Sequence, residues 1–318
     1  MCFSFVSNSE LQNQTQTNTM TNLQEPALFT YTLHDWVDQE KLDWKILSSN
    51  PNAVNLLEKN YKKINWKNLS TNPSAIHILK RNSSKISWKG LSTNPNAIHL
   101  LMRNQSKIHW REFSVNPNSG HFLSKNPERV VYDWLSENPN TTQLLEKNTK
   151  NVEWRMLSRN PNALNILENN PDKINWFGLS VNPNAIYLLE KNPEKVSWGM
   201  LSGNSNAIHL LEKNQDKIHW ASLSSNPNAI NLLEKNLEKG VNWALMCMNP
   251  NAARLLEKNP EKILWKPLSA NPSIFKKTLN YKYLKERMDI IREELMMKCM
   301  HPSRLERWLE MGGELDDF

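Results

Sequence analysis

Glycine and cysteine are both scarce in this chain, with 8 glycines and 3 cysteines among 318 residues. The cysteines (Cys2, Cys247 and Cys299) lie far apart and form neither a CxxC pair nor a zinc-binding spacing. We therefore expect no disulfide framework, no metal site and a reduced compartment. There is also no glycine-rich loop of the kind that holds phosphates.

Long apolar runs are missing as well. No stretch approaches the roughly 18 uncharged apolar residues of a membrane-spanning helix. The opening MCFSFVSNSE lacks the basic and then apolar pattern of a secretory signal. We expect a cytoplasmic protein that is not secreted and has no membrane partner. Because HExxH and GxSxG motifs are absent too, we predict no enzyme, no catalytic residues and no cofactor.

The sequence has instead a period of 22 residues. Ten of its 13 tryptophans follow this period, apart from one position filled by Tyr132 and one longer step that absorbs Gly240. They are Trp44, Trp66, Trp88, Trp110, Trp154, Trp176, Trp198, Trp220, Trp243 and Trp265. Asn-Pro pairs keep the same register, and the consensus reads I-x-W-x-x-L-S-x-N-P-N-A-I-x-L-L-E-K-N-P-x-K. A fixed period of this length is typical of a solenoid.

Each half of the repeat carries its own helix signals. A polar residue precedes the tryptophan, as Asn65 precedes Trp66, and can cap the first helix. Asn50 with Pro51 begins the second helix, since proline suits the first helical position. Asn60 is expected to end it, because asparagine tolerates the left-handed conformation. No alternating apolar pattern appears, so we expect no strands.

A single repeat cannot fold alone. Ordering its 22 residues costs roughly 20–40 kcal/mol of backbone entropy. Its few apolar side chains return on the order of 10–20 kcal/mol when buried. Stacking must therefore complete the burial. We predict an all-α fold, an α-solenoid of about eleven helix-turn-helix repeats with the tryptophans in its core. At roughly 8–10 Å per layer it would be a rod or superhelix about 90–110 Å long.

The chain divides into four segments. Residues 1–30 form an Asn/Gln/Thr-rich tail that we expect to be disordered. Residues 31–43 are an atypical first copy, which would act as the N-terminal cap, and residues 44–274 are the tandem-repeat solenoid. Residues 275–318 are expected to form a C-terminal helical cap, with a longer helix followed by a shorter one.

The repeats LSxNPNAIxLLEKN and the ending RMDIIREELMMKCMHPSRLERWLEMGGELDDF resemble uncharacterised 22-residue tandem-repeat proteins of giant nucleocytoplasmic DNA viruses. The resemblance covers nearly the whole chain beyond the N-terminal tail. It implies a viral origin, hence a place in the host-cell cytoplasm, and a repeat fold. It carries no functional residues over to this chain.

One candidate surface is a ladder of polar side chains within the A-I-x-L-L segment. Its members are Asn55, His77, His99, His121, Gln143, Asn165, Tyr187, His209, Asn231 and Arg254. A solvated helix face explains such a ladder. The alternative is recognition of one base per repeat, as in several RNA-binding solenoids. The histidines cannot share one zinc ion, because layers about 10 Å apart hold them too far from each other.

A second candidate surface is basic. The net charge is +7, yet residues 44–109 carry ten more basic than acidic residues, so the rest of the chain is net acidic. Lys45, Lys67, Lys89 and Arg111 share the position after the tryptophan, about one Debye length apart. These cations are either solvated surface or a patch for an acidic partner. The candidate partner-binding residues are Lys45, Lys67, Lys80, Arg81, Lys89, Arg103, Arg111, His77 and His99.

These patterns favour a non-enzymatic protein-interaction scaffold that presents an extended surface to a protein partner. The alternative is a nucleic-acid-binding solenoid that uses the basic repeats at 44–111. The repeats from residue 176 onward carry Glu-Lys pairs that cancel, which is typical of solvated surface. The oligomeric state does not follow from the sequence.

Overall fold

The computed structural model describes residues 29–312. Tyr31–Thr278 form one compact unit, and the chain from Leu279 onward belongs with residues 1–30 to a second. The tail expected at residues 1–30 therefore lies, except for its last two residues, outside the described part of the chain.

The first unit is the predicted all-α solenoid, and each repeat supplies two short helices. The first helix of each repeat begins at the periodic tryptophan or at Tyr132. These helices are α2 (Trp44–Leu47), α4 (Trp66–Leu69), α6 (Trp88–Thr93), α8 (Trp110–Val115), α10 (Tyr132–Leu135), α12 (Trp154–Arg159), α14 (Trp176–Leu179), α16 (Trp198–Leu201), α18 (Trp220–Leu223), α20 (Trp243–Met248) and α22 (Trp265–Leu268). Asn65 caps α4 as expected, because its side chain accepts a hydrogen bond from the Asn68 amide at 3.0 Å.

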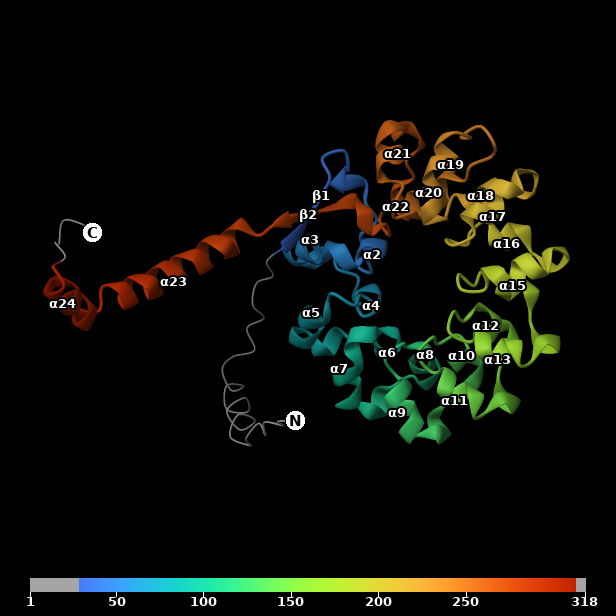
Figure 1. The fold of residues 1–318 in the computed structure, drawn as a ribbon, viewed down its shortest axis with the longest axis horizontal. Coiled ribbons are helices and arrows are strands. Elements are labelled where there is room, and N and C mark those ends of the chain that lie inside the picture. Colours follow the sequence, from blue (N-terminus) through green and yellow to red (C-terminus); the bar gives the residue numbers. More distant parts are fainter. Residues whose placement is uncertain (1–28, 313–318) are drawn as a thin grey trace. The chain divides into compact units, whose positions relative to one another are not determined.

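The second helices lie outside the first. For example, α5 lies outside α4 and α21 outside α22 (Figure 1), so we call the two sets the outer and the inner helices. The outer helices are α3 (Val54–Lys59), α5 (Ile76–Arg81), α7 (Ile98–Met102), α9 (Gly120–Lys125), α11 (Thr142–Glu146), α13 (Leu164–Glu168), α15 (Ile186–Lys191), α17 (Ile208–Lys213), α19 (Ile230–Glu234) and α21 (Ala253–Lys258). Leucines such as Leu157 on an inner helix and Leu167 on an outer one are fully buried between the layers.

Short 3-10 helices complete the repeats. Those that precede inner helices are Gln39–Lys41, Tyr61–Lys63, Ser83–Lys85, Gln105–Lys107, Pro127–Arg129, Thr149–Asn151, Pro171–Lys173, Pro193–Lys195, Gln215–Lys217 and Pro260–Lys262. Four more begin at Asn-Pro prolines: Pro51–Ala53, Pro95–Ala97, Pro227–Ala229 and Pro272–Ile274. Asn50 caps the first of these, as expected, by accepting from the Asn52 amide at 3.0 Å.

The end of the outer helix differs from the expectation. Asn60 has a φ of −120°, so it does not adopt the left-handed conformation. Its side-chain amide donates instead to the Leu56 carbonyl oxygen at 2.9 Å. The asparagine therefore ends the helix through a side-chain hydrogen bond to an open carbonyl, and no positive φ is needed.

The stack of repeats closes on itself, so the predicted rod or superhelix is wrong. The inner helices surround a common centre, with α2 beside α22 (Figure 1). Asn50 Nδ2 donates to the carbonyl oxygens of Ser269 at 3.1 Å and Asn271 at 3.0 Å. The Asp43 amide donates to Ser269 Oγ at 2.8 Å. Rotation between neighbouring repeats, accumulated around the stack, brings the last repeat back to the first.

Two strands lie at the seam, and the expectation of no strands is wrong. β1 (Phe29–Leu33) pairs with β2 (Phe275–Leu279) in a two-stranded sheet. Lys276 on β2 also forms an ion pair with Asp35, which follows β1, with Nζ 3.0 Å from Oδ1. The long helix expected from residue 275 therefore begins later: α23 spans Tyr281–Cys299 and α24 spans Pro302–Glu310, both in the second unit.

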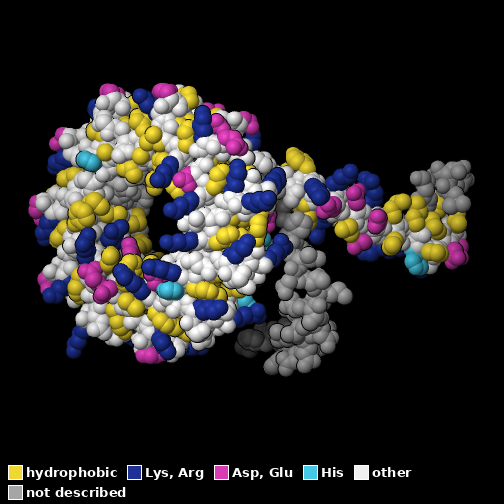
Figure 2. All heavy atoms as spheres, turned by 180° about the vertical axis from the view of Figure 1, so that it is seen from behind, with side chains coloured by type: hydrophobic (Ala, Val, Ile, Leu, Met, Phe, Trp, Pro, Cys, Tyr) yellow, Lys and Arg dark blue, Asp and Glu magenta, His cyan; other side chains and the backbone are white. Residues whose placement is uncertain are grey.

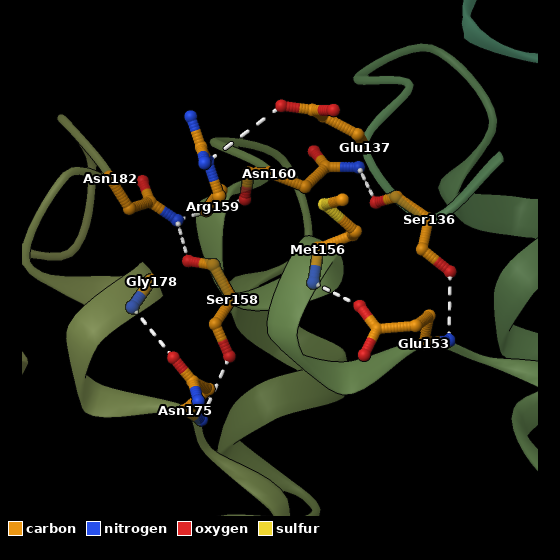
Figure 3. A network of polar contacts seen from close by, with 10 residues as sticks. All are labelled: Ser136, Glu137, Glu153, Met156, Ser158, Arg159, Asn160, Asn175, Gly178 and Asn182. Atoms are coloured by element: carbon orange, nitrogen blue, oxygen red, sulfur yellow. Dashed lines mark hydrogen bonds and ion pairs between the residues drawn. The ribbon is translucent and has the colours of Figure 1, made fainter. Parts of the chain in front are cut away.

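A ladder of buried asparagines joins the repeats. Asn160 is fully buried and donates through Nδ2 to the carbonyl oxygen of Ser136 at 3.0 Å (Figure 3) and to that of Asn138 at 2.9 Å. Its Oδ1 accepts from the Asn162 amide at 3.0 Å, so donor and acceptor are both satisfied. Within residues 29–312 eleven asparagines make the same pair of bonds to the preceding repeat: Asn50, Asn72, Asn94, Asn116, Asn138, Asn160, Asn182, Asn204, Asn226, Asn249 and Asn271. Because the partner of Asn50 is Asn271, the ladder is a closed circle.

A buried serine reinforces each interface. Ser158 Oγ accepts from the Asn175 amide of the next repeat at 3.0 Å (Figure 3) and donates to the Trp154 carbonyl oxygen at 2.7 Å. Cys247 occupies this position in one repeat, where its Sγ accepts from the Leu264 amide at 3.3 Å. Burial raises the pKa of the Cys247 thiol, which keeps it protonated and unreactive. The cysteine thus acts in packing.

Candidate functional site

The inner helices surround an opening through the ring. Figure 2 shows this opening, with Lys and Arg side chains gathered at its edge on the face drawn. The residue after the tryptophan is exposed on four successive inner helices: Lys45, Lys67, Lys89 and Arg111. The structure therefore places these four predicted residues in equivalent positions on α2, α4, α6 and α8.

Ring closure adds a fifth cation that the sequence analysis missed. Lys266 follows Trp265 on α22 and is exposed. Because α22 packs against the first repeat, Lys266 precedes Lys45 around the ring. The two ends of the stack are in direct contact here, since Lys41 Nζ lies 5.3 Å from the centre of the Trp265 ring. We call Lys266, Lys45, Lys67, Lys89 and Arg111 the basic arc. The register position of Lys266 was visible in the sequence, but its place beside Lys45 was not.

A second row of cations stacks on the tryptophans. Lys63 Nζ, for example, lies 4.4 Å from the centre of the Trp44 ring of the preceding repeat. In the five repeats of the basic arc the pairs are Lys41–Trp265, Lys63–Trp44, Lys85–Trp66, Lys107–Trp88 and Arg129–Trp110. Elsewhere in the ring they are Lys195–Trp176, Lys217–Trp198 and Lys239–Trp220.

These contacts correct the expectation that the tryptophans are core residues. All ten are partly buried: they pack against the core and remain partly exposed. A cation over the face of an indole is attracted by the negative potential of the ring. The tryptophans therefore join the hydrophobic core to the basic surface.

The basic arc keeps most of its charge. Lys45, Lys67 and Lys266 take part in none of the ion pairs found within residues 29–312. Lys89 Nζ lies 3.3 Å from Glu112 Oε1, and the Arg111 guanidinium lies 4.4 Å from the centre of the Trp134 ring. The arc is thus a continuous positive surface in which only Lys89 is neutralised by a neighbouring carboxylate.

The rest of the inner surface is different. The position of the basic arc is occupied in the following repeats by Asp133, Arg155, Phe177, Gly199, Ala221 and Ala244. Asp133 and Arg155 cancel, and the other four are uncharged. Phe177 is 50% exposed. At this position the inner helices therefore have a basic part and a part with no net charge.

The remaining predicted cations lie elsewhere. Lys80 and Arg81 end the outer helix α5, and Arg103 is the C-cap residue of α7. All three are exposed. Because outer and inner helices form different layers of the ring, the structure separates these cations from the basic arc.

The polar ladder lies on the outer helices, and several members bond to the preceding repeat. His77 Nε2 lies 2.9 Å from Glu58 Oε1, and His209 Nε2 lies 3.0 Å from Glu190 Oε1. The Tyr187 hydroxyl donates to Glu168. His99 is exposed. In the preceding repeat, Lys80 occupies the position of the glutamate that bonds to the other three side chains. Side chains tied to a neighbouring glutamate are poorly suited to read one base each.

Tyr187 provides a pH-dependent test of this outer contact. The hydrogen bond to Glu168 raises the pKa of Tyr187 from 10.0 to about 12, because the carboxylate favours the neutral phenol. The stabilisation is complete below pH 10 and is lost as the pH rises through about 12. An absorbance titration of tyrosinate should show this late step. Glu168→Gln should move it toward the ordinary value, and an unchanged titration would contradict the contact.

In the described part of the chain, no three His, Cys, Asp or Glu residues lie close enough together to hold a metal ion. None of the helices described is both long and apolar enough to cross a membrane. A hollow of about 310 Å³ lies between α9 and α11, where Gly120 stands in place of the usual isoleucine. Its lining includes His121, Gln143 and Lys147.

Comparisons with known proteins add no relative. No family model matches the chain, and neither a curated protein nor a solved structure matches it.

Proposed function

We propose that the chain is a non-enzymatic scaffold, a closed ring that presents its exposed side chains to another macromolecule, in the first place a protein. One observation carries this proposal. The polar residues that recur in the repeats, the buried asparagines and serines, are engaged in holding the ring together. The residues after each tryptophan vary from Lys45 to Phe177 to Ala221. A uniform frame with a varied surface is typical of repeat proteins that bind partners.

Nucleic acid is the second candidate partner. The basic arc places five cations in successive repeats at one register position, and a polyanion gains affinity from each phosphate it neutralises. The glutamates of the outer helices make the outer surface less suitable for such a partner. This form of the scaffold would use the repeats at 44–111, together with Lys266.

We further propose that the protein works in a reduced compartment, the host-cell cytoplasm if the chain is viral. The buried protonated thiol of Cys247 suits such a compartment. The viral origin depends on the sequence resemblance alone.

A pull-down of the tagged full chain from its native cells, split into nuclease-treated and untreated halves, tests the choice of partner. Proteins retained after nuclease treatment are the expected result for the scaffold. Partners lost on nuclease treatment would transfer the proposal to nucleic acid. Rapid turnover of a substrate by the purified ring would contradict the non-enzymatic assignment.

A further inference from the structure

We propose that the basic arc binds single-stranded nucleic acid along the inner side of the ring, and that ring closure completes the site by placing Lys266 beside Lys45. This inference rests on the nucleic-acid form of the proposed function. It specifies single-stranded nucleic acid as the partner and the inner side of the ring as the binding face. It also adds Lys266, which the sequence pattern did not group with the other cations.

The cations of the basic arc are closely spaced. Successive repeats are packed helix layers, about 10 Å apart, which is close to one Debye length at physiological salt. Neighbouring arc cations therefore reinforce each other along a curved path. Lys45, Lys67 and Lys266 are exposed and belong to no ion pair in the described residues, so their ammonium groups are open to phosphates.

The cations stacked on the tryptophans lie in the same repeats as the basic arc. In each repeat of the basic arc, a lysine or arginine stacks on the tryptophan that directly precedes the arc residue, as Lys63 stacks on Trp44 next to Lys45. Other repeats retain some of these stacked cations, such as Lys195 on Trp176, but there the residue after the tryptophan is uncharged, as Phe177 is. Two rows of cations therefore run together in the arc repeats only.

Curvature favours a single strand over a duplex. The five cations of the basic arc lie on successive repeats of a closed ring, so a bound strand must turn through more than a third of a circle within about 40 Å. A duplex resists so tight a bend, because its persistence length is about 50 nm. A flexible single strand can follow the positive path with its backbone.

Acidic residues limit the site. Glu112 neutralises Lys89 in part, at 3.3 Å, and Asp133 occupies the arc position after Arg111. The strand is therefore expected to follow the arc from Lys266 to Arg111 and to leave it at Asp133. Five cations would give a slope of log Kd against log salt of about 3–4, at about 0.7 per phosphate contact for a single strand.

The test is fluorescence anisotropy of the full chain with a fluorescein-labelled oligothymidylate over a series of salt concentrations. Lys266→Gln and Lys45→Gln are each expected to weaken binding and to lower the salt slope by about 0.7. Lys213→Gln is the matched control, because Lys213 is an exposed lysine at the end of the outer helix α17. It should leave affinity and slope unchanged. Circular dichroism confirms that each variant is folded.

The other outcomes each overturn the inference at a different step. Loss of binding with Lys45→Gln but not with Lys266→Gln would show an open basic strip that does not depend on ring closure. Tighter binding to a duplex of equal length would overturn the preference for a single strand. Absence of binding to single strands and duplexes would overturn the nucleic-acid site altogether. The protein scaffold is judged separately, by partners that survive nuclease treatment.

Discussion

Replacing Asn160 with alanine is expected to lower the free energy of unfolding of the ring by about 2–6 kcal/mol, because two buried carbonyl oxygens lose their donor at about 1–3 kcal/mol each. Asn160 is fully buried, and its Nδ2 bonds to Ser136 at 3.0 Å and Asn138 at 2.9 Å. No water can replace the lost donor at such a site without a cavity large enough to hold it. The loss is read from the shift of the denaturant midpoint, followed by circular dichroism.

Asn162→Ala is the matched control for this substitution. Asn162 is two residues further along, is exposed, and donates from Nδ2 to the Pro139 carbonyl oxygen at 3.0 Å. Water can satisfy that carbonyl when the side chain is removed, so the cost should stay near or below about 1 kcal/mol. Equal midpoints for the two variants would show that the buried ladder is not what holds neighbouring repeats together.

Asn50→Ala is expected to destabilise the ring as much as Asn160→Ala does, although Asn50 lies in the first complete repeat. In an open solenoid the amide of Asn50 would have no preceding repeat to bond to, and its removal would have little effect beyond loss of the cap. In the closed ring it is 1% exposed and bonds to Ser269 and Asn271, so the same two carbonyl oxygens are lost. The expected cost is again about 2–6 kcal/mol.

The measurement pairs denaturation with small-angle X-ray scattering. The control is Asn271→Ala, whose amide bonds to Cys247 and Asn249 within the last repeats and does not cross the seam. Both variants should be destabilised, but only Asn50→Ala weakens closure and should increase the radius of gyration. An Asn50→Ala variant with an unchanged midpoint and an unchanged radius would contradict the closed ring.

The local features of the repeat were predictable because each depends on a few neighbouring residues. The tryptophan period located the inner helices, and Asn50 with Pro51 located the next turn, since capping and the fixed φ of proline act over one or two residues. Asn60 was correctly predicted to end the outer helix, but the predicted mechanism was wrong. Its side-chain bond to the Leu56 carbonyl oxygen replaces the left-handed backbone conformation that its residue type suggested.

The candidate site was predictable only in part. Lys45, Lys67, Lys89 and Arg111 could be grouped because they share a register position in consecutive repeats. Lys80, Arg81 and Arg103 were grouped with them by net charge, which does not distinguish the two layers of helices. The cations stacked on the tryptophans were also missed, because each pair joins residues of two different repeats.

By itself, the sequence determined the repeat, its two helices, the approximate number of copies and the need to stack, because all of these follow from short-range periodicity and from the apolar area of one unit. Only the tertiary structure decided that the stack is a closed ring, that β1 pairs with β2, and that Lys266 joins Lys45. The physical reason is that closure depends on the rotation between neighbouring repeats. That rotation is set by side-chain packing at every interface, and its effect accumulates over eleven interfaces before the two ends meet.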